Sequence, residues 1–229
     1  MLARIFSCAV VGLDGVIVEV EVDYTVGLPG LMTIVGLPDA AVQESRERVQ
    51  TAIRNAGLDF PRKRVVVNLA PASVRKEGPA YDLPIALGVM VLAGYLPHEV
   101  VENTLVVGEL SLDGLVRHTR GVLPMAATAR ANGYKRIIVA EVDAAEAALI
   151  PDFEVIPVKT LASLFDHLSG RHSIEPYSLN TEEPTPQFVP TDFSEVKGQE
   201  HVKRALEVAA AGGHNVLMMC PINHQLPVN

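Results

Sequence analysis

Three serines, Ser73, Ser111 and Ser163, are the candidate nucleophiles of this chain. A serine nucleophile needs a base beside it, yet neither a G-x-S-x-G elbow nor an H-E-x-x-H zinc motif occurs in the sequence. The 7 histidines are scattered, and the two cysteines, Cys8 and Cys220, lie far apart. These residue types and spacings predict neither hydrolytic chemistry nor a metal site.

Two short segments are candidates for holding an anion. KEGPAYDLP (residues 76–84) precedes a predicted helix, and the free N–H groups and dipole at a helix N-terminus attract negative charge. RKR (residues 62–64) is the only compact basic stretch. The cationic candidates are Arg75 and Lys76 first, then Arg62, Lys63 and Arg64. The alternative for KEGPAYDLP is an ordinary helix entry capped by Asp82, and both interpretations stay open.

The repeated GLP tripeptide in GLPGLMTIVGLPD (residues 27–39) allows two interpretations. Its glycines suit a loop around a phosphate, but the spacing of a dinucleotide or P-loop motif is missing. Two tight turns on either side of a strand explain the same residues, because Gly and Pro are the residues that such turns need. Turn chemistry favours the second interpretation.

The elements that must position these residues begin with consecutive strands. Residues 3–12, 16–25 and 31–37 are strand candidates separated by turns, and residues 16–25 alternate apolar and polar side chains. Asp39 is a candidate N-cap for a helix that ends at Gly57. A strand at residues 64–71 then leads to a helix after Asp82 that is apolar nearly all round, which predicts a helix buried inside the domain.

The second half of the sequence alternates between strands and helices. Strands are expected near residues 104–110, 136–141 and 153–158, and helices near residues 122–133 and 161–170. GELSLDGLVR (residues 108–117) predicts a hairpin that turns at Asp113–Gly114. We therefore predict an α/β domain with α+β-like mixed-sheet character.

Composition limits the class of protein. The chain is 48% hydrophobic and 20% charged, with a net charge of −8, which excludes a surface devoted to nucleic acid. With no signal peptide or bilayer-length apolar run in the sequence, we expect a cytoplasmic protein without a membrane partner. A proline-rich stretch from residue 171 to residue 190 predicts a linker. A new helix (residues 199–211) and a buried strand, NVLMM (residues 215–219), follow it.

TDFSEVKGQEHVKRALEVAAAGGHNVLMM (residues 191–219) resembles the opening of the ATPase domain in magnesium-chelatase-like AAA+ proteins of the YifB/ComM family. Three upstream stretches, VGLPDAAVQESRERVQTAIRNAG, VVNLAPASVRKEGPAYDLPIALG and VVGELSLDG, resemble the N-terminal domain of the same family. The resemblance covers essentially residues 1–219. It implies a two-layer N-terminal domain with the fold of the Lon protease proteolytic domain and of a small-subunit ribosomal protein (residues 1–170). A linker (171–190), the start of the AAA+ domain (191–219) and a tail unlike the family (220–229) are then expected to follow.

The same resemblance implies what is missing. Lon-like proteases carry a serine nucleophile in K-D-G-P-S-A-G and a lysine in a following helix, whereas this chain has Ala80 at the serine position and no lysine in residues 122–131. We therefore expect no protease activity. In the family, G-P-P-G-S-G-K-T follows the strand NVLMM, but here Cys220, Ile222 and Asn223 stand in that loop and no Lys or Thr follows. A frameshift, a disrupted gene or an artificial shortening explains this change better than an evolved ending.

The resemblance leaves three functional hypotheses. The first is a non-catalytic N-terminal module of an ATP-driven hexameric motor that migrates DNA branches during natural transformation. The second is a chelatase-type Mg-ATP-dependent ATPase subunit, and the third is an oligomerisation domain without a ligand. Val196, Gly198 and Gln199 match the stretch that lies near the adenine in such ATPases. ATP and Mg²⁺ are therefore expected for the intact family member and no cofactor for this chain, with DNA and further copies of the chain as partners of the intact protein.

Overall fold

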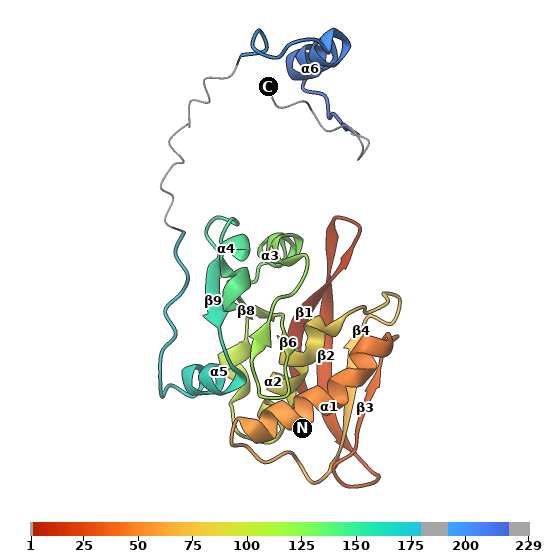
Figure 1. The fold of residues 1–229 in the computed structure, drawn as a ribbon. Helices are drawn as coiled ribbons and strands as arrows, with labels where there is room; N and C mark the ends of the chain where they lie inside the picture. The colour runs from red at the N-terminus through yellow and green to blue at the C-terminus, as the bar shows by residue number, and fades with distance from the viewer. Residues whose placement is uncertain (1, 180–191, 220–229) are drawn as a thin grey trace. The chain divides into compact units, whose positions relative to one another are not determined.

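The computed structural model describes residues 2–179 and 192–219, which fall into two compact units, residues 1–180 and 181–229. The first unit is built on a seven-stranded mixed sheet in the order β3-β4-β2-β1-β5-β8-β9 (Figure 1). Its strands are β1 (Ala3–Val11), β2 (Asp14–Thr25), β3 (Met32–Val35), β4 (Arg64–Ala70), β5 (Thr104–Val106), β8 (Arg136–Ala140) and β9 (Glu154–Val158). The mixed α/β fold expected from the sequence is confirmed.

Antiparallel pairing joins β1 to β2 and β2 to β4, whereas the pairs β3–β4, β1–β5, β5–β8 and β8–β9 are parallel. This change of direction follows the sequence, in which consecutive strands come first and alternating strands and helices come later. A two-residue turn, Gly12–Leu13, closes the β1–β2 hairpin, and its pairing runs without a break from Val11↔Asp14 to Ala3↔Val22.

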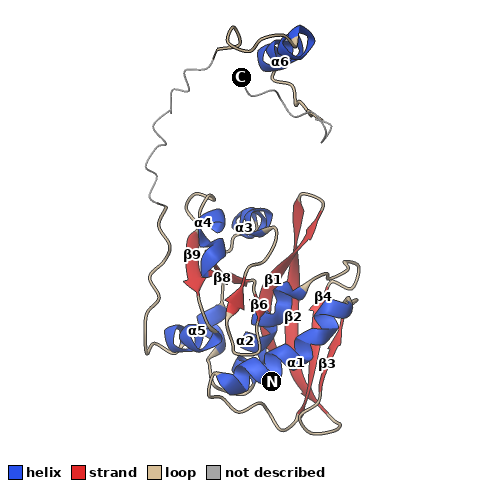
Figure 2. Ribbon diagram, in the orientation of Figure 1, coloured by secondary structure: helices blue, strands red, loops and turns tan. Residues whose placement is uncertain are grey.

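Helices cover both faces of the sheet (Figure 2). The first core cluster joins one face to α1 (Ala40–Asn55), α2 (Asp82–Leu92) and α5 (Leu161–Leu168). The second cluster joins the other face to α3 (Val122–Ala131) and α4 (Ala144–Ala147). Short 3-10 turns precede α2 (η1, Pro79–Tyr81), precede β5 (η2, His98–Val101) and join β8 to α4 (η3, Glu141–Asp143). The small ribbon of β6 (Glu109–Leu110) and β7 (Val116–Arg117) is the hairpin predicted from GELSLDGLVR.

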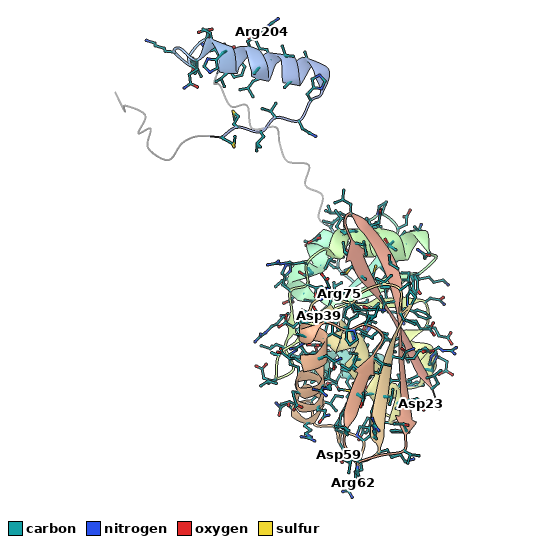
Figure 3. The ribbon with its side chains drawn as sticks, turned by 90° about the vertical axis from the view of Figure 1, so that its right-hand side faces the viewer. Asp23, Asp39, Asp59, Arg62, Arg75 and Arg204 are labelled. Atoms are coloured by element: carbon teal, nitrogen blue, oxygen red, sulfur yellow. The ribbon has the colours of Figure 1, made fainter. Side chains whose placement is uncertain are left out.

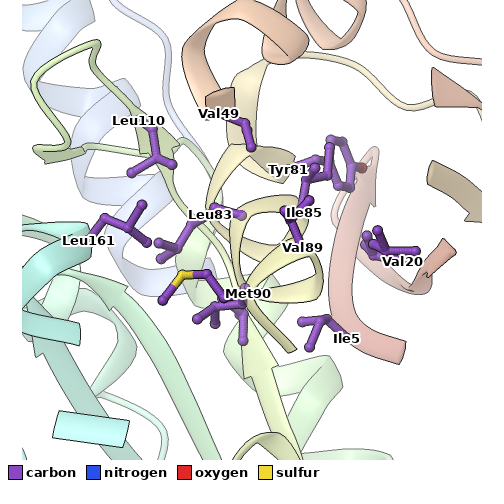
Figure 4. Close-up of a cluster of buried hydrophobic side chains, with 14 of the residues drawn as sticks. Ile5, Val20, Val49, Tyr81, Leu83, Ile85, Val89, Met90, Leu110 and Leu161 are labelled. Atoms are coloured by element: carbon purple, nitrogen blue, oxygen red, sulfur yellow. The ribbon is translucent and has the colours of Figure 1, made fainter. Parts of the chain in front are cut away.

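Helix α2 is the centre of the first core, as its apolar sequence predicts. All eleven of its residues are buried, and Figure 4 shows Leu83, Ile85 and Met90 among side chains from neighbouring strands and helices. Gly88 allows the close approach of α2 to β2, because a Cβ atom there would lie 2.5 Å from Val22 Cγ2. The helix therefore packs directly against the sheet.

The start of α2 differs from the expectation for Asp82. This residue is the first of the helix, Tyr81 is its N-cap, and no side-chain capping hydrogen bond forms there. The buried Asp82 carboxylate accepts hydrogen bonds from Arg48 Nε (2.6 Å) and from the backbone N–H of Leu110 (3.1 Å). It therefore ties α2 to α1 and to β6 instead of capping its own helix.

The second unit contains α6 (Glu200–Gly212), close to the expected helix. The strand predicted at residues 215–219 is wrong, because these residues are not in a strand and their side chains from Val216 to Met219 are exposed. A strand needs a neighbour for its backbone hydrogen bonds, and the described part of this unit supplies none. The tail (220–229) and most of the expected linker (residues 180–190) lie outside the described residues. None of the described helices has the length and apolar character needed to cross a bilayer.

Candidate functional site

A cleft with a volume of about 860 Å³ lies beside the end of β1 in the first unit. One wall is formed by β1 and its turn (residues 8–12), and another by the loop that leads into α2 (residues 73–81). Glu109, Met125 and the segment from His118 to Arg120 complete the lining. The cleft thus gathers segments from across the sequence, including part of the predicted anion-binding segment.

Asp39 holds the wall formed by residues 73–81 in place. Its carboxylate caps α1 by accepting from Val42 N (2.8 Å), as predicted, and also accepts from Gly78 N (3.0 Å). Its backbone N–H donates to Lys76 O (3.0 Å), and Pro38 forms a parallel bridge with Lys76. The GLPD and KEGP segments are therefore bonded to each other, and the Asp39 carboxylate accepts hydrogen bonds from both the helix α1 and the loop.

The backbone conformation and surroundings of Gly36 explain why the second GLP turn contains a glycine. Its φ of 102° lies in the region that favours glycine, and a Cβ atom there would lie 2.2 Å from Leu69 O. The residue is thus required by the close approach of this turn to β4. Turn geometry accounts for this part of the repeat.

The structure corrects the expectation for Lys76. Its side chain is fully buried and its Nζ donates to Pro71 O, so the ammonium group is not on the surface. Burial also lowers the pKa of Lys76, because the charged form is poorly solvated there. The neighbouring Arg75 is exposed and lies 3.5 Å from the Glu77 carboxylate. Of this pair, only Arg75 is placed to meet an external anion.

The backbone N–H groups at the start of α2 are also engaged. Asp82 N–H donates to Pro79 O, and Leu83 N–H donates to Gly108 O at 3.0 Å. Because these donors are used and the helix is buried, its N-terminus is not an open anion site of the kind that KEGPAYDLP suggested. The ordinary helix entry is the better interpretation of this segment.

The basic stretch of residues 62–64 lies elsewhere. Figure 3 shows Arg62 beside Asp59 at one end of the first unit, with Arg75 and Asp39 toward the other end. Lys63 Nζ lies 4.9 Å from the centre of the Tyr24 ring, a cation–π contact. Arg64 is half-buried and its guanidinium donates to Thr33 Oγ1 (3.3 Å). The candidate cations therefore form two separate regions and not one basic site.

Ala80 has no group able to attack a substrate. It is buried beside the cleft, and its carbonyl accepts a hydrogen bond from Gly108 N (3.0 Å). The residues of α3, VLPMAATARA, include no lysine. The three candidate serines have other surroundings. Ser163 caps α5 together with Thr160, and Ser111 forms hydrogen bonds within the β6–β7 turn. Ser73 is exposed at the cleft wall.

Sequence reasoning missed a histidine–aspartate pair at the cleft. His118 Nδ1 contacts the carboxylate of the buried Asp143, which also accepts from the Thr119 N–H (2.9 Å). The partners are 25 positions apart, so no local spacing reveals them. Within the described residues no serine or cysteine is hydrogen-bonded to His118, and a nucleophile–base arrangement is therefore not formed.

The proposed remnant of an adenine site lies in the second unit. Val196 is exposed, Gly198 has a φ of 74°, and Gln199 takes a left-handed conformation as the N-cap of α6. Residues 220–229 contain no Lys, Ser or Thr, the residue types that reach phosphate and Mg²⁺ in P-loop ATPases. The expected departures from the phosphate loop, at Cys220, Ile222 and Asn223, fall outside the described residues.

Comparison with known proteins gives two family matches. The model described as subunit ChlI of Mg-chelatase matches residues 20–143, and the model described as magnesium chelatase, subunit ChlI, matches residues 192–223. An uncharacterised protein of Mycobacterium tuberculosis is 44% identical over 220 residues, YifB of Salmonella typhimurium 40% over 221, and the competence protein ComM of Haemophilus influenzae 37% over 223. In each case the alignment covers 96% of this chain and 43% of the relative, so the chain spans less than half the length of these proteins.

Weaker similarity links the chain to Lon proteases. Lon protease 2 of Bacillus subtilis is 27% identical over 172 residues, which is 68% of this chain and 30% of the protease. A Lon protease of Azorhizobium caulinodans is 27% identical over 175 residues, which is 71% of this chain and 20% of the protease. This likeness agrees with the mixed α/β fold of the first unit.

Proposed function

Because this chain belongs to the Mg-chelatase-like family that includes YifB and ComM, we propose that it is the non-catalytic N-terminal module of a ComM-type AAA+ protein. The intact protein, on this proposal, is an ATP-dependent motor that migrates DNA branches during natural transformation. The N-terminal domain contributes to assembly or to contact with the substrate, and ATP and Mg²⁺ belong to the intact motor.

The proposal of a non-catalytic role rests on the residues that stand at the cleft in place of the catalytic serine and lysine. Acyl transfer of the Lon type requires a serine and an activating lysine. Here a buried alanine, Ala80, stands in the serine position, and the lysine nearest to it in sequence, Lys76, is enclosed with its Nζ bonded to Pro71 O. Fold similarity alone does not supply function. The residues that line the cleft include Ser73 but no lysine that could activate it.

DNA contact is proposed for the whole protein, and of the five candidate cations Arg62, Lys63 and Arg75 are the exposed ones. The net charge of −8 opposes strong binding of DNA by the chain alone. Contacts at these residues are therefore expected to add to those of the motor rather than to replace them. The name of ComM, a competence protein, agrees with a role in handling DNA.

The test uses the purified chain in three assays: ATP hydrolysis, labelling by a fluorophosphonate serine probe, and fluorescence anisotropy with a branched DNA at several salt concentrations. We expect no turnover and no labelling. If Arg62 or Arg75 binds a phosphate, its replacement by Glu is expected to reduce the slope of log K against log salt by about 1. Hydrolysis of ATP, or labelling at a serine, contradicts the proposal.

A second candidate, an oligomerisation domain, is favoured by exposed apolar side chains. Val26 is 96% exposed and Leu28 73%, and the two lie close together in the segment that joins β2 to β3, where they could form an apolar contact with another copy. Light scattering distinguishes the two candidates. Self-association that persists while DNA binding is absent favours the oligomerisation domain, whereas a monomer with salt-sensitive DNA binding favours substrate engagement.

A further inference from the structure

Strand β1 has one edge that is only partly covered. It pairs with β2 along its whole length, but on its other side the register with β5 consists of one pair, Phe6↔Leu105. After that pair, β5 turns away, since Val107 N donates to Ile138 O and Gly108 N donates to Ala80 O. Within the described part of the chain, no other strand pairs with residues 8–11 on this side.

The register identifies the main-chain groups on this edge. In an antiparallel pair, alternate residues direct their N–H and C=O groups toward the partner, and the intervening residues direct theirs away. Val11 and Asp14 close the two-residue turn, so Val11 and Ala9 bond to β2. Phe6 faces β5, and Cys8 and Val10 share its parity. The N–H and C=O groups of Cys8 and Val10 therefore face away from β2, but Cys8 has no exposed surface, so those of Val10 are the ones that a ligand can reach.

This free edge forms a wall of the cleft described above. Residues 8–12 line the cleft opposite the loop of residues 73–81, and its volume of about 860 Å³ lies in the range of ligand-binding clefts. An extended peptide needs such a setting, because its main chain bonds to a strand edge while its side chains alternate between the two sides. The cleft thus combines room with a template for strand addition.

The charges in the cleft favour an acidic ligand. Arg75 lies 3.5 Å from Glu77, and the Glu109 carboxylate lies 3.5 Å from Arg117. Arg120 lines the cleft, is exposed, and makes no ion pair with any residue that the structure describes. A carboxylate is its natural complement.

Two further groups at the cleft suit the same ligand. Thr119 Oγ1 is buried at the wall without a hydrogen-bond partner, which is costly unless a partner arrives. Val10 and Val11 expose apolar side chains at the rim. The cleft therefore offers main-chain, hydroxyl, apolar and cationic contacts together.

We propose that this cleft binds an extended segment of a partner protein, whose main chain pairs with the N–H and C=O groups of Val10 on β1 and whose acidic side chain contacts Arg120. This goes beyond the role proposed above and does not depend on ATP or DNA. A bound segment would remain intact, because neither Ala80 nor the His118–Asp143 pair supplies an attacking group. Nucleic acid suits the cleft less well, since Glu77 and Glu109 also line it.

The experiment selects binders from a random heptapeptide display library on the intact chain and measures their affinity as synthetic peptides. We expect the selected peptides to share an acidic residue at a fixed position. Methylation of single peptide nitrogens is expected to abolish binding at the residue whose N–H bonds to Val10 O and to leave it nearly unchanged at the two neighbouring residues, because adjacent N–H groups point away from the strand. An equal effect at every position overturns strand addition.

Two variants locate the site, with one control. Val10→Pro removes an N–H that faces away from β2, which an edge position tolerates, and Arg120→Glu reverses the unpaired cation. Each is expected to weaken binding about tenfold or more, whereas Arg62→Glu, on the same unit but away from the cleft, is not. Tyrosine fluorescence and urea titration verify that Val10→Pro is folded. Failure to select any peptide, or equal losses in Arg120→Glu and Arg62→Glu, overturns the proposal.

Discussion

The ion pair between Arg48 and Asp82 offers a quantitative test of how the cleft wall is held. The Asp82 carboxylate is fully buried, while the Arg48 side chain is 18% exposed. Arg48 also donates to Ala41 O (2.9 Å), and Asp82 accepts from Leu110 N (3.1 Å). Replacing Arg48 by Met therefore keeps an apolar stem of similar length and leaves a buried carboxylate without its cation.

Removing one partner of a buried pair costs about 3–5 kcal/mol. Because Arg48 is partly exposed, we expect the lower end, about 3 kcal/mol of unfolding free energy at pH 7.5. The double variant Arg48→Met/Asp82→Leu removes the unpaired charge but leaves the Leu110 N–H and the buried Ser45 hydroxyl without these partners, a loss of about 1–3 kcal/mol for each group. The two single losses are thus expected to be strongly non-additive.

The loss of unfolding free energy caused by Arg48→Met should depend on pH. Burial raises the pKa of Asp82, and the hydrogen bonds and charge of Arg48 lower it. Without Arg48 the pKa rises further, because burial is less opposed. A carboxyl group with a raised pKa in the folded state stabilises the fold fully below its unfolded pKa, near 3.9, and this contribution is lost as the pH rises through the folded pKa. The destabilisation by Arg48→Met should therefore be smaller at pH 4.5 than at pH 7.5.

Urea unfolding followed by tyrosine fluorescence measures these values. The chain has 5 tyrosines and no tryptophan, and all of the tyrosines lie in the first unit, at Tyr24, Tyr81, Tyr95, Tyr134 and Tyr177. Arg54→Met, an exposed position on the same helix, is the control and should change stability by less than about 0.5 kcal/mol. A loss below about 1 kcal/mol for Arg48→Met at pH 7.5, or an equal loss at both pH values, refutes the reasoning.

Two further predictions concern the packing of the first unit. Gly36→Ala should cost at least about 2 kcal/mol in the same urea titration, because its Cβ atom would lie 2.2 Å from Leu69 O. Gly94→Ala, also at positive φ but with open space around it, should cost only about 1 kcal/mol, and equal losses would show that the steric argument is wrong. Burial raises the pKa of the Cys8 thiol from 9.0 to about 11, so its thiolate fraction at pH 8 is about 100-fold lower than at an exposed site. Mass spectrometry of iodoacetamide-treated protein should find Cys8 nearly unmodified until urea unfolds the chain, and rapid modification of the folded chain would contradict this burial.

Much of the first unit could be predicted from local patterns. The alternation in residues 16–25 predicts β2, the N-cap at Asp39 predicts α1, and the apolar stretch after Asp82 predicts a buried α2, all of which the structure contains. These elements follow from short-range rules of spacing and capping. The strand predicted at residues 215–219 failed because an apolar run becomes a strand only beside a partner.

The candidate site was less predictable, because its groups meet only in the folded chain. Sequence spacing placed Lys76 at a helix start, but burial under the loop depends on contacts with Pro71 and Leu37. The pairing of His118 with Asp143 and the free edge of β1 arise from long-range topology. Local patterns carry no information on such contacts, so these features required the structure.

The most direct test of the proposed role is a domain exchange with ComM of Haemophilus influenzae, which is 37% identical to this chain over 223 residues. The matching first domain of ComM is replaced by residues 1–180 of this chain, a compact unit with its own core. ATP-dependent branch migration is then measured on a three-strand DNA substrate, with ComM lacking this domain as the control. We expect the exchanged protein to migrate branches with ATP, the control to be impaired, and the present chain alone to show no activity. An exchanged protein that assembles and hydrolyses ATP but migrates no better than the control contradicts the proposed role.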